Sequence, residues 1–231
     1  MKYNLKTVFV GILSLTLASC GSEESEKATT DEVVSESQVT EQGSEQLTGV
    51  NIEYSAARFE NGVSYGELSM GDPNAPVTII EYASLTCSHC ASFHNTILPE
   101  IKKNYIDTGK ARLVYRNFLL NQYDMYASMI SRCATPEKSF GLMSLFFSRQ
   151  STWLNQDYLN QLASLARRAG MSRASVDACM ANTELQENLI EMQTYGSEVD
   201  NVTATPTFII NGTVVSGANR DAIIAAVEDA L

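Results

Sequence analysis

Two cysteines separated by two residues, in Cys87-Ser88-His89-Cys90, have the clearest chemical potential in the sequence. They follow an apolar run and precede a segment with helical spacing, so we expect the first sulfur at a helix N-terminus. Unpaired backbone N–H groups and the helix dipole favour a thiolate there, and a protonated histidine beside it adds to the effect. Cys90, one turn further on, is expected to be the buried resolving thiol. A pair with this spacing can form a disulfide that exchanges with a substrate thiol.

The same residues are compatible with two other roles. A purely structural disulfide can have this spacing, although so short a ring constrains little chain entropy. A copper or zinc site could combine the two thiolates with His89 or His94, because thiolates and imidazoles bind these metals. Haem attachment would need a histidine directly after Cys90, where the sequence has Ala91.

The segments around the cysteine pair alternate between strand and helix. Residues 77–83 are predicted to form a buried strand after a turn-rich segment, and residues 88–105 a helix that bends at Pro99. The remaining predicted elements are a strand over 111–118, a hairpin of strands over 207–210 and 213–215, and a final helix over 219–231.

The stretch from residue 122 to about residue 200 has a helical pattern throughout, with turn signals that divide it into four or five helices. It lies between the second predicted strand and the hairpin. The order of elements therefore predicts an α/β fold with an all-helical insertion at about 120–200.

Several short motifs together resemble the DsbA family of thiol-disulfide oxidoreductases, which is part of the thioredoxin superfamily. They are Glu81-Tyr82-Ala83-Ser84-Leu85-Thr86 before the cysteine pair, Phe93-His94 and Leu98-Pro99 after it, and Thr205-Pro206 before the strand at 207–210. The resemblance covers about residues 66–231. It implies a thioredoxin fold with an inserted helical subdomain, in agreement with the predicted order of elements.

The resemblance also implies catalytic roles for individual residues. Cys87 corresponds to the family's nucleophile and Cys90 to its resolving cysteine. His89 corresponds to a histidine that stabilises the thiolate. Glu81 corresponds to a buried acid that relays protons to or from the buried thiol, a role that requires a pKa raised by desolvation. An exposed glutamate at the end of a strand is the alternative for this position.

Three further residues are implied in substrate binding. Thr205 and Pro206 correspond to the residues of a cis-proline loop that faces the cysteine pair and lines the substrate groove. Ser88 stands where the family's commonest motif has proline, so it adds a backbone N–H near the first sulfur and relaxes the turn. This departure leaves the redox potential open.

Three cysteines lie outside the pair. Cys20 follows an apolar run that is too short for a permanent membrane span and is typical of a signal peptide over 1–19. The run ends in Leu17-Ala18-Ser19, which resembles a bacterial lipobox and implies lipid attachment at Cys20. Cys133 and Cys179 then form an even pair in an exported chain, and we expect a structural disulfide between them, with two buried free thiols as the alternative.

Charge and composition describe the region between the lipid and the domain. Residues 21–50 hold eight acidic side chains against the single Lys27, and a disordered acidic tether is expected over 20–65. The folded domain is expected over 66–231. The whole chain has 27 Asp and Glu against 16 Lys and Arg without a basic stripe, which excludes a duplex nucleic-acid binder.

These features predict an exported, lipid-anchored thiol-disulfide oxidoreductase that introduces disulfides into secreted or periplasmic proteins. It is expected to be monomeric and to use the Cys87–Cys90 disulfide with no other cofactor and no metal. Expected partners are unfolded exported protein thiols, a DsbB-like membrane protein that reoxidises the pair, and the membrane itself, at the periplasm or the outer face of a bacterial membrane.

Three alternatives remain open at this point. One is a disulfide isomerase or reductase with the same chemistry, although the isomerase branch implies a folded dimerisation module where this chain has a polar tether. Another is a copper- or zinc-binding chaperone that uses Cys87, Cys90 and His94. A peptide-binding lipoprotein without catalysis is the third, and it would not need the cysteine pair.

Overall fold

The computed structural model of the chain describes residues 57–231. The predicted signal peptide over 1–19, the lipidation at Cys20 and most of the tether over 20–65 lie outside the described residues. Within 57–231, no helix has both the length and the apolar composition that crossing a bilayer requires.

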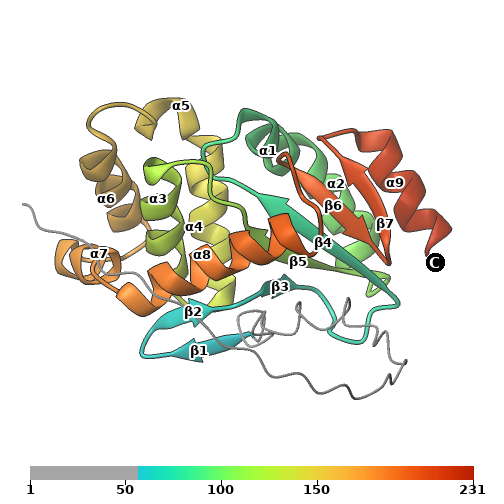
Figure 1. The fold of residues 1–231 in the computed structure, drawn as a ribbon, viewed down its shortest axis with the longest axis horizontal. Helices are drawn as coiled ribbons and strands as arrows, with labels where there is room; N and C mark the ends of the chain where they lie inside the picture. The colour runs from blue at the N-terminus through green and yellow to red at the C-terminus, as the bar shows by residue number, and fades with distance from the viewer. Residues whose placement is uncertain (1–56) are drawn as a thin grey trace, which may run out of the picture. The chain divides into compact units, whose positions relative to one another are not determined.

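A five-stranded sheet forms the centre of the domain, with the strand order β3-β5-β4-β6-β7 (Figure 1). Its two central strands, β4 (Val77–Ala83) and β5 (Ala111–Asn117), are parallel. The other pairings are antiparallel, between β3 (Leu68–Met70) and β5, between β6 (Thr207–Ile210) and β4, and between β7 (Thr213–Ser216) and β6. The four strands predicted from the sequence are confirmed to within one residue at their ends, whereas β3 was not predicted.

The predicted helix after the cysteine pair is present, but its hydrogen bonding changes along its length. Its consecutive parts are α1 (Ser88–Ser92), η2 (Phe93–Ile97), α2 (Leu98–Ile101) and η3 (Lys102–Ile106), of which η2 and η3 are π-helical. In η2, the N–H of Leu98 donates to the carbonyl oxygen of Phe93, five residues earlier. Pro99 follows directly and lacks the N–H that an α-helical bond would need. The proline thus coincides with a change of helix type within a continuous helical segment.

Alternation along β4 divides the core into two layers. Val77 and Ile79 are fully buried and pack with Phe93 and with Val227 of the last helix, α9 (Arg220–Asp229). Tyr82 points to the opposite face, where it belongs to a small cluster beneath α8 (Thr183–Glu198). The helix that begins at the cysteine pair and α9 therefore cover one face of the sheet, and α8 covers the other.

The helical insertion follows β5 and precedes β6 in the chain, and it lies beside the sheet (Figure 1). Within the described chain it contains six helices, where four or five are predicted: α3 (Gln122–Arg132), α4 (Pro136–Ser148), α5 (Gln150–Trp153), α6 (Tyr158–Arg168), α7 (Arg173–Met180) and α8. The prediction is wrong because α5 is a single turn, too short for a periodic pattern.

The expected disulfide between Cys133 and Cys179 is confirmed, with the two Cα atoms 6.1 Å apart. It joins the residue that follows α3 to a buried position in α7. Closing a loop across 46 residues of sequence separation stabilises the fold by about 4 kcal/mol in the chain-entropy model.

A short hairpin precedes the sheet, within the range over which the tether is predicted. Strands β1 (Arg58–Glu60) and β2 (Val63–Tyr65) are joined at Asn61-Gly62, where both residues have positive φ. The fully buried Arg132 of the helical insertion donates a hydrogen bond to the carbonyl oxygen of Ser64 at 3.2 Å. The folded domain thus begins before residue 66. This hairpin was not predicted, because strands of three residues are too short to show an alternating pattern.

Gly196 of α8 provides a test of how closely this helix packs on the sheet. A Cβ added at Gly196 would lie 2.6 Å from Cε1 of Tyr82. Gly196→Ala is therefore expected to lower the free energy of unfolding by about 1–3 kcal/mol, because the buried ring must move. Urea denaturation measures the change.

The matched control is Gly141→Ala in α4, where nothing lies within 4 Å of an added Cβ. This change is expected to be neutral or to stabilise by up to about 1 kcal/mol, because alanine has the higher helix propensity. Equal losses of stability in the two variants would contradict the close packing of α8 on Tyr82.

Candidate active site

Cys87 lies at a helix N-terminus, as predicted, because β4 ends four residues before it and α1 begins directly after it. It is the N-cap residue of α1, and its Sγ accepts a hydrogen bond from the backbone N–H of Cys90 at 3.4 Å. The N–H of Cys87 donates to the carbonyl oxygen of Ser84 at 3.2 Å and closes the preceding turn. Cys87 is partly exposed, Cys90 is buried, and both thiols are free, so the structure represents the reduced pair.

The two thiols have opposite environments. The pKa of Cys87 is lowered to about 5, chiefly by a hydrogen bond from the Cys90 thiol. Desolvation opposes this shift, and the side chain of Thr205 and the backbone N–H groups of Cys90 and His89 support it. Burial, the hydrogen bond to Cys87 and the charge of Glu81 raise the pKa of Cys90. At neutral pH, Cys87 is therefore a thiolate and Cys90 a thiol.

His89 lies two residues after the thiolate, and the predicted effect of its imidazole on Cys87 stays a prediction. Its side chain is exposed on α1, and its effect on the pKa of Cys87 comes through the backbone N–H. A charge on the exposed ring would be screened by solvent. Ser88, the first residue of α1, is also exposed, so both residues between the cysteines are accessible to another molecule.

Glu81 is fully buried, so it is not the exposed strand-end glutamate of the alternative. It shares the face of β4 that carries Ile79, and its carboxylate oxygens lie 3.0 and 3.1 Å from Nε2 of His94. The imidazole of His94 stacks on the ring of Phe147 with centroids 4.1 Å apart. Glu81 and His94 form a buried polar pair, and the negative charge of Glu81 helps to raise the pKa of Cys90.

The Thr205–Pro206 peptide bond is cis, as predicted. In its thiol form, Cys87 donates a hydrogen bond to the carbonyl oxygen of Thr205 at 3.3 Å. Pro206 is buried and Thr205 is partly exposed. The fold thus brings a loop more than a hundred residues away in sequence against the first cysteine, as the resemblance implies.

Gln150, at the start of α5, reaches the active-site loop from the helical insertion and was not predicted. Its Nε2 donates to the carbonyl oxygens of Leu85 at 2.9 Å and of Cys87 at 3.0 Å. Helix α5 is held in place by the fully buried Trp153, whose Nε1 donates to the carbonyl oxygen of Phe146 at 2.8 Å. The helical insertion therefore fixes the backbone on both sides of Thr86.

Asp124 is a second residue of the site that was not predicted from the sequence. Its buried carboxylate accepts hydrogen bonds from the N–H of Leu85 at 2.9 Å, the N–H of Leu120 at 3.2 Å and the hydroxyl of Ser128 at 3.3 Å. Burial raises the pKa of Asp124 to about 6, and the hydrogen bonds oppose the rise. The one sequence signal is its position three residues after the N-cap Asn121, the spacing of a capping box.

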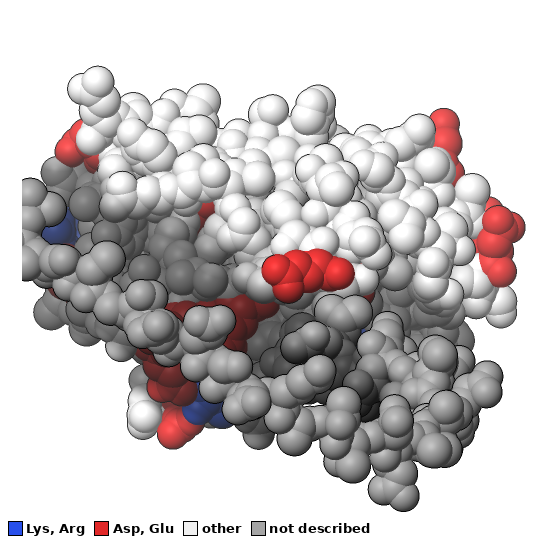
Figure 2. All heavy atoms as spheres, viewed as in Figure 1, with Lys and Arg blue, Asp and Glu red and all other residues white. Residues whose placement is uncertain are grey.

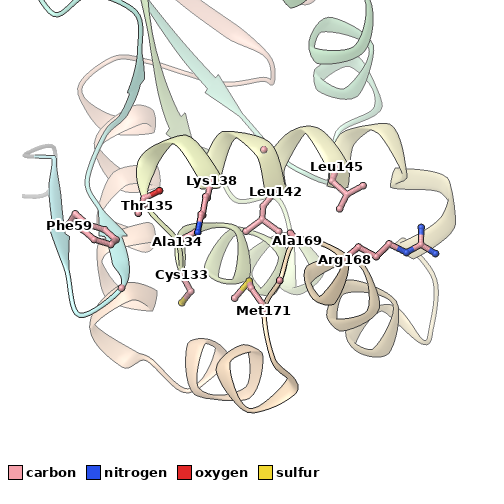
Figure 3. Close-up of a pocket in the computed structure, with 13 residues that line it drawn as sticks. Phe59, Cys133, Ala134, Thr135, Lys138, Leu142, Leu145, Arg168, Ala169 and Met171 are labelled. Carbon is pink, nitrogen blue, oxygen red and sulfur yellow. The ribbon is translucent and has the colours of Figure 1, made fainter.

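A cavity of about 700 Å³ lies apart from the cysteine pair, between the β1–β2 hairpin, α4 and the end of α6 (Figure 3). Figure 3 shows Phe59 on one side, Leu142 and Met171 near the middle and Arg168 pointing outward. Its lining includes Cys133 of the structural disulfide but neither Cys87 nor Cys90. The cavity is therefore separate from the candidate active site.

An N-capping cysteine that faces a cis-proline, with a second cysteine buried one turn further on, is a dithiol site of the thioredoxin type. Comparison with known proteins agrees with this class. Residues 64–229 match the model of a family described as thioredoxin, and the chain belongs to this family.

Individual relatives place the chain near DsbA proteins. A provisionally named protein-disulfide oxidoreductase of Rickettsia conorii is 32% identical over 171 residues, which cover 73% of this chain and 62% of the relative. Disulfide bond formation protein D of Bacillus subtilis is 25% identical, with 72% and 78% covered. The crystal structure of Wolbachia pipientis alpha-DsbA1 has a TM-score of 0.67 and 27% identity, over 75% of this chain and 92% of that one. The matched part spans 61–66% of the Rickettsia relatives.

The lowered pKa of Cys87 predicts its reactivity. Alkylation of the reduced protein by iodoacetamide is expected to be half-maximal near pH 5 and to level off above about pH 6, because only the thiolate reacts. Cys90→Ala removes the strongest stabilising hydrogen bond and is expected to move the midpoint upward by about one unit or more. Mass spectrometry of the alkylated peptide follows the reaction. A wild-type midpoint near the free-cysteine value of about 8.5 would show that the thiolate is not stabilised.

The contacts of Gln150 predict a positioning role. Gln150→Ala is expected to lower the free energy of unfolding by about 1–2 kcal/mol and to raise the midpoint of Cys87 alkylation, because the loop loses both donated hydrogen bonds. In Gln150→Glu, the new carboxyl group can donate a hydrogen bond only when it is protonated. The loss in free energy of unfolding is therefore expected to shrink as the pH falls through the pKa of this carboxyl group.

The control is Gln161→Ala, which removes only an exposed contact with Asp157 on α6. Urea denaturation and the alkylation profile are measured for all three variants. A Gln150→Ala protein with an unchanged alkylation profile would refute the positioning role, even if its stability fell.

Proposed function

We propose that this chain is an exported thiol-disulfide oxidoreductase that donates the Cys87–Cys90 disulfide to thiols of secreted or periplasmic proteins. The observation that carries the proposal is the contrast between the two sulfurs, with a stabilised thiolate at the N-cap and a buried thiol behind it. A stabilised thiolate favours the reduced pair, so the oxidised pair tends to accept electrons from other thiols.

The exchange takes place in two steps, each of which breaks one S–S bond and forms another. A client thiolate attacks Sγ of Cys87 in the oxidised protein, because Cys90 is buried. Cys90 leaves with the electron pair of the broken bond and takes up a proton, because its pKa is raised. A second client thiolate then attacks the client sulfur of the mixed disulfide, and Cys87 leaves as a thiolate. The client gains a disulfide, and the protein gains two electrons and one proton.

The same geometry suggests roles for the neighbouring residues. Glu81 relays the proton that Cys90 takes up or releases, and His94 holds the Glu81 carboxylate through the contacts at 3.0 and 3.1 Å. In the reverse direction, Cys90 attacks the sulfur of Cys87 in a mixed disulfide and resolves it. Thr205, Pro206 and Ser88 lie around Cys87 and contact the bound client.

Two alternatives are less well supported by these contacts. A reductase needs a pair that prefers the oxidised form, whereas the lowered pKa of Cys87 stabilises the reduced form. A copper- or zinc-binding chaperone would use His94 together with the cysteines, but Nε2 of His94 faces Glu81. Among residues 57–231, no cluster of three or more His, Cys, Asp or Glu side chains is arranged to hold a metal ion.

The cellular setting is part of the proposal. The lipobox-like sequence before Cys20 supports lipid attachment to the outer face of a bacterial membrane, with the acidic tether between lipid and domain. The working cycle requires a DsbB-like membrane protein that reoxidises the pair. The names of the relatives, which describe disulfide oxidoreductases and disulfide bond formation, support the reaction class. We propose that the protein works as a monomer.

The reduction potential tests the direction of electron flow. At pH 7, a thiolate pKa of about 5 lies two units below ambient, which corresponds to about 60 mV above the potential of about −270 mV for thioredoxin, whose thiolate pKa is near 7. Because Cys87 is partly exposed, solvent screening reduces this gain, and we expect a potential of about −240 to −210 mV.

Equilibration with glutathione buffers measures the potential, and oxidation of a reduced, unfolded ribonuclease measures the activity. Cys87→Ser is the inactive control. A potential at or below about −270 mV, with no oxidation of the ribonuclease, would identify a reductase and overturn the proposed oxidase.

A further inference from the structure

We infer that the cavity between the β1–β2 hairpin, α4 and the end of α6 binds a free fatty acid, with the carboxylate at Lys138 and the acyl chain among apolar side chains. The inference goes beyond the proposed function and does not depend on it, because neither Cys87 nor Cys90 lines the cavity. Its volume of about 700 Å³ lies within the range of about 300–1,000 Å³ that is usual for small-molecule sites.

The apolar part of the cavity consists mainly of aliphatic side chains. Leu142 of α4 is buried, and Leu145 and Met171 are partly buried. Figure 3 shows Leu142 and Met171 near the middle of the lining, with Phe59 on the side of the hairpin. The thioether side chain of a methionine is flexible and can adapt its shape to a ligand. Such walls match an acyl chain, which is apolar along its length and can bend.

Gly141 keeps one wall of the cavity open. It lies in the interior of α4, where glycine is less favourable than alanine by about 1 kcal/mol. A Cβ added at this position would have nothing within 4 Å of it, so no described group requires a glycine there. The backbone of α4 is therefore exposed to the cavity at Gly141, and a ligand can approach it closely.

The charged part of the cavity is positive. Lys138 and Arg168 line it, no acidic residue does, and within residues 57–231 neither cation has an ion pair. In the view of Figure 3, Lys138 extends from α4 into the space between Phe59 and Leu142, whereas Arg168 points outward. One ammonium group among apolar side chains matches a ligand that carries a single negative charge at the end of an apolar chain.

The charge of the cavity is opposite to that of the chain. The formal net charge is −11, so the long-range field of the protein favours cations over anions. Figure 2 shows one face of the molecule, on which acidic side chains are visible along α8 and at the margins and basic ones cover only small areas. An anion in the cavity must therefore be held at short range by Lys138 and Arg168. The sign of charge that the site prefers is a sharp test for this reason.

Isothermal titration calorimetry with decanoate, 1-decanol and decylammonium, which have acyl or alkyl chains of equal length, tests the inference. Decanoate is expected to bind at one site and at least about five times more tightly than 1-decanol, which cannot form a charged pair with Lys138. Decylammonium is expected to bind more weakly than either, against the preference of the net charge. The shorter hexanoate is expected to bind at least about tenfold more weakly than decanoate, because fewer methylene groups are buried.

Two variants locate the ligand. Lys138→Met keeps an unbranched side chain without the charge, and it is expected to weaken decanoate binding by about threefold to tenfold and to leave 1-decanol binding unchanged. Gly141→Leu places a side chain in the open space beside α4, and it is expected to weaken the binding of both ligands by about tenfold or more.

Matched controls accompany these variants, and urea denaturation checks that each one folds. Lys103 is exposed in η3 and does not line the cavity, so Lys103→Met is expected to leave decanoate binding unchanged. Gly141→Ala adds a single methyl group and is expected to weaken binding by less than about threefold. Cys87→Ser is expected to bind decanoate as the wild type does, which separates this site from the thiol chemistry.

Three results would overturn the inference directly. The first is a wild type that does not bind decanoate. The second is equal binding of decanoate by the wild type, Lys138→Met and Gly141→Leu, since the ligand would then lie elsewhere. The third is equal affinity for decanoate and decylammonium, because the cations of the cavity would then not select the ligand. None of these results bears on the oxidation of client thiols, so the proposed function is tested separately.

Three further results would assign the cavity to another occupant and overturn the fatty-acid site. Binding to phosphatidylglycerol vesicles that depends on Lys138, without binding of free decanoate, would indicate a membrane lipid. A dimer in sedimentation equilibrium that decanoate dissociates would indicate a second copy of the chain. Decanoate binding that appears only when the eight acidic residues of 21–50 are replaced by their amides would indicate that segment of the chain itself.

Discussion

The buried carboxylate of Asp124 holds together the segments on which the rest of the site depends. One oxygen accepts the N–H of Leu85 in the active-site loop, and the other accepts the N–H of Leu120 after β5. A buried carboxylate is destabilising unless its oxygens accept hydrogen bonds. Displacement of either loop would therefore leave one oxygen of Asp124 buried without its backbone donor. The loop that presents Cys87 and the loop that leads into α3 are therefore held by one residue, which lies in the first turn of α3.

A second constraint is the alternation of side chains along β4. The face that carries Val77 and Ile79 is covered by the helix that starts at the cysteine pair, and Glu81 lies on that same face. The strand therefore carries an acid into the apolar layer beneath Cys90, where its charge has a strong effect. Its closest described partner is His94, which comes from the covering helix. Strand period and helix period together produce the buried pair.

The predictability of each feature from the sequence follows from how local its cause is. The strand before the cysteines, the N-cap position of Cys87 and the helical block were predicted, because periodicity and turn residues specify them within a short window. The β1–β2 hairpin and α5 were missed, because three or four residues are too few for a pattern. Gln150 was missed for another reason. Gln150 and Cys87 are 63 residues apart in sequence, and the residues next to Gln150 in the chain give no signal of this contact.

For His89, adjacency in sequence predicted that the charge of the imidazole stabilises the thiolate. The structure adds a second contribution, because the backbone N–H of His89 lowers the pKa of Cys87 while the side chain is exposed. The cis bond at Thr205–Pro206 was predicted from the family resemblance alone. Composition could not predict it, because most X-Pro bonds in folded proteins are trans.

Trp153, the single tryptophan of the chain, lies in α5 three residues after Gln150, and α5 holds the loop of the redox pair. Its indole is fully buried and its N–H is bonded to the carbonyl oxygen of Phe146. The Gln150 amide donates to the carbonyl oxygen of Cys87, and Trp153 lies in the same single turn. Light of a wavelength that only tryptophan absorbs therefore excites a single place in the fold, the turn that holds the redox loop.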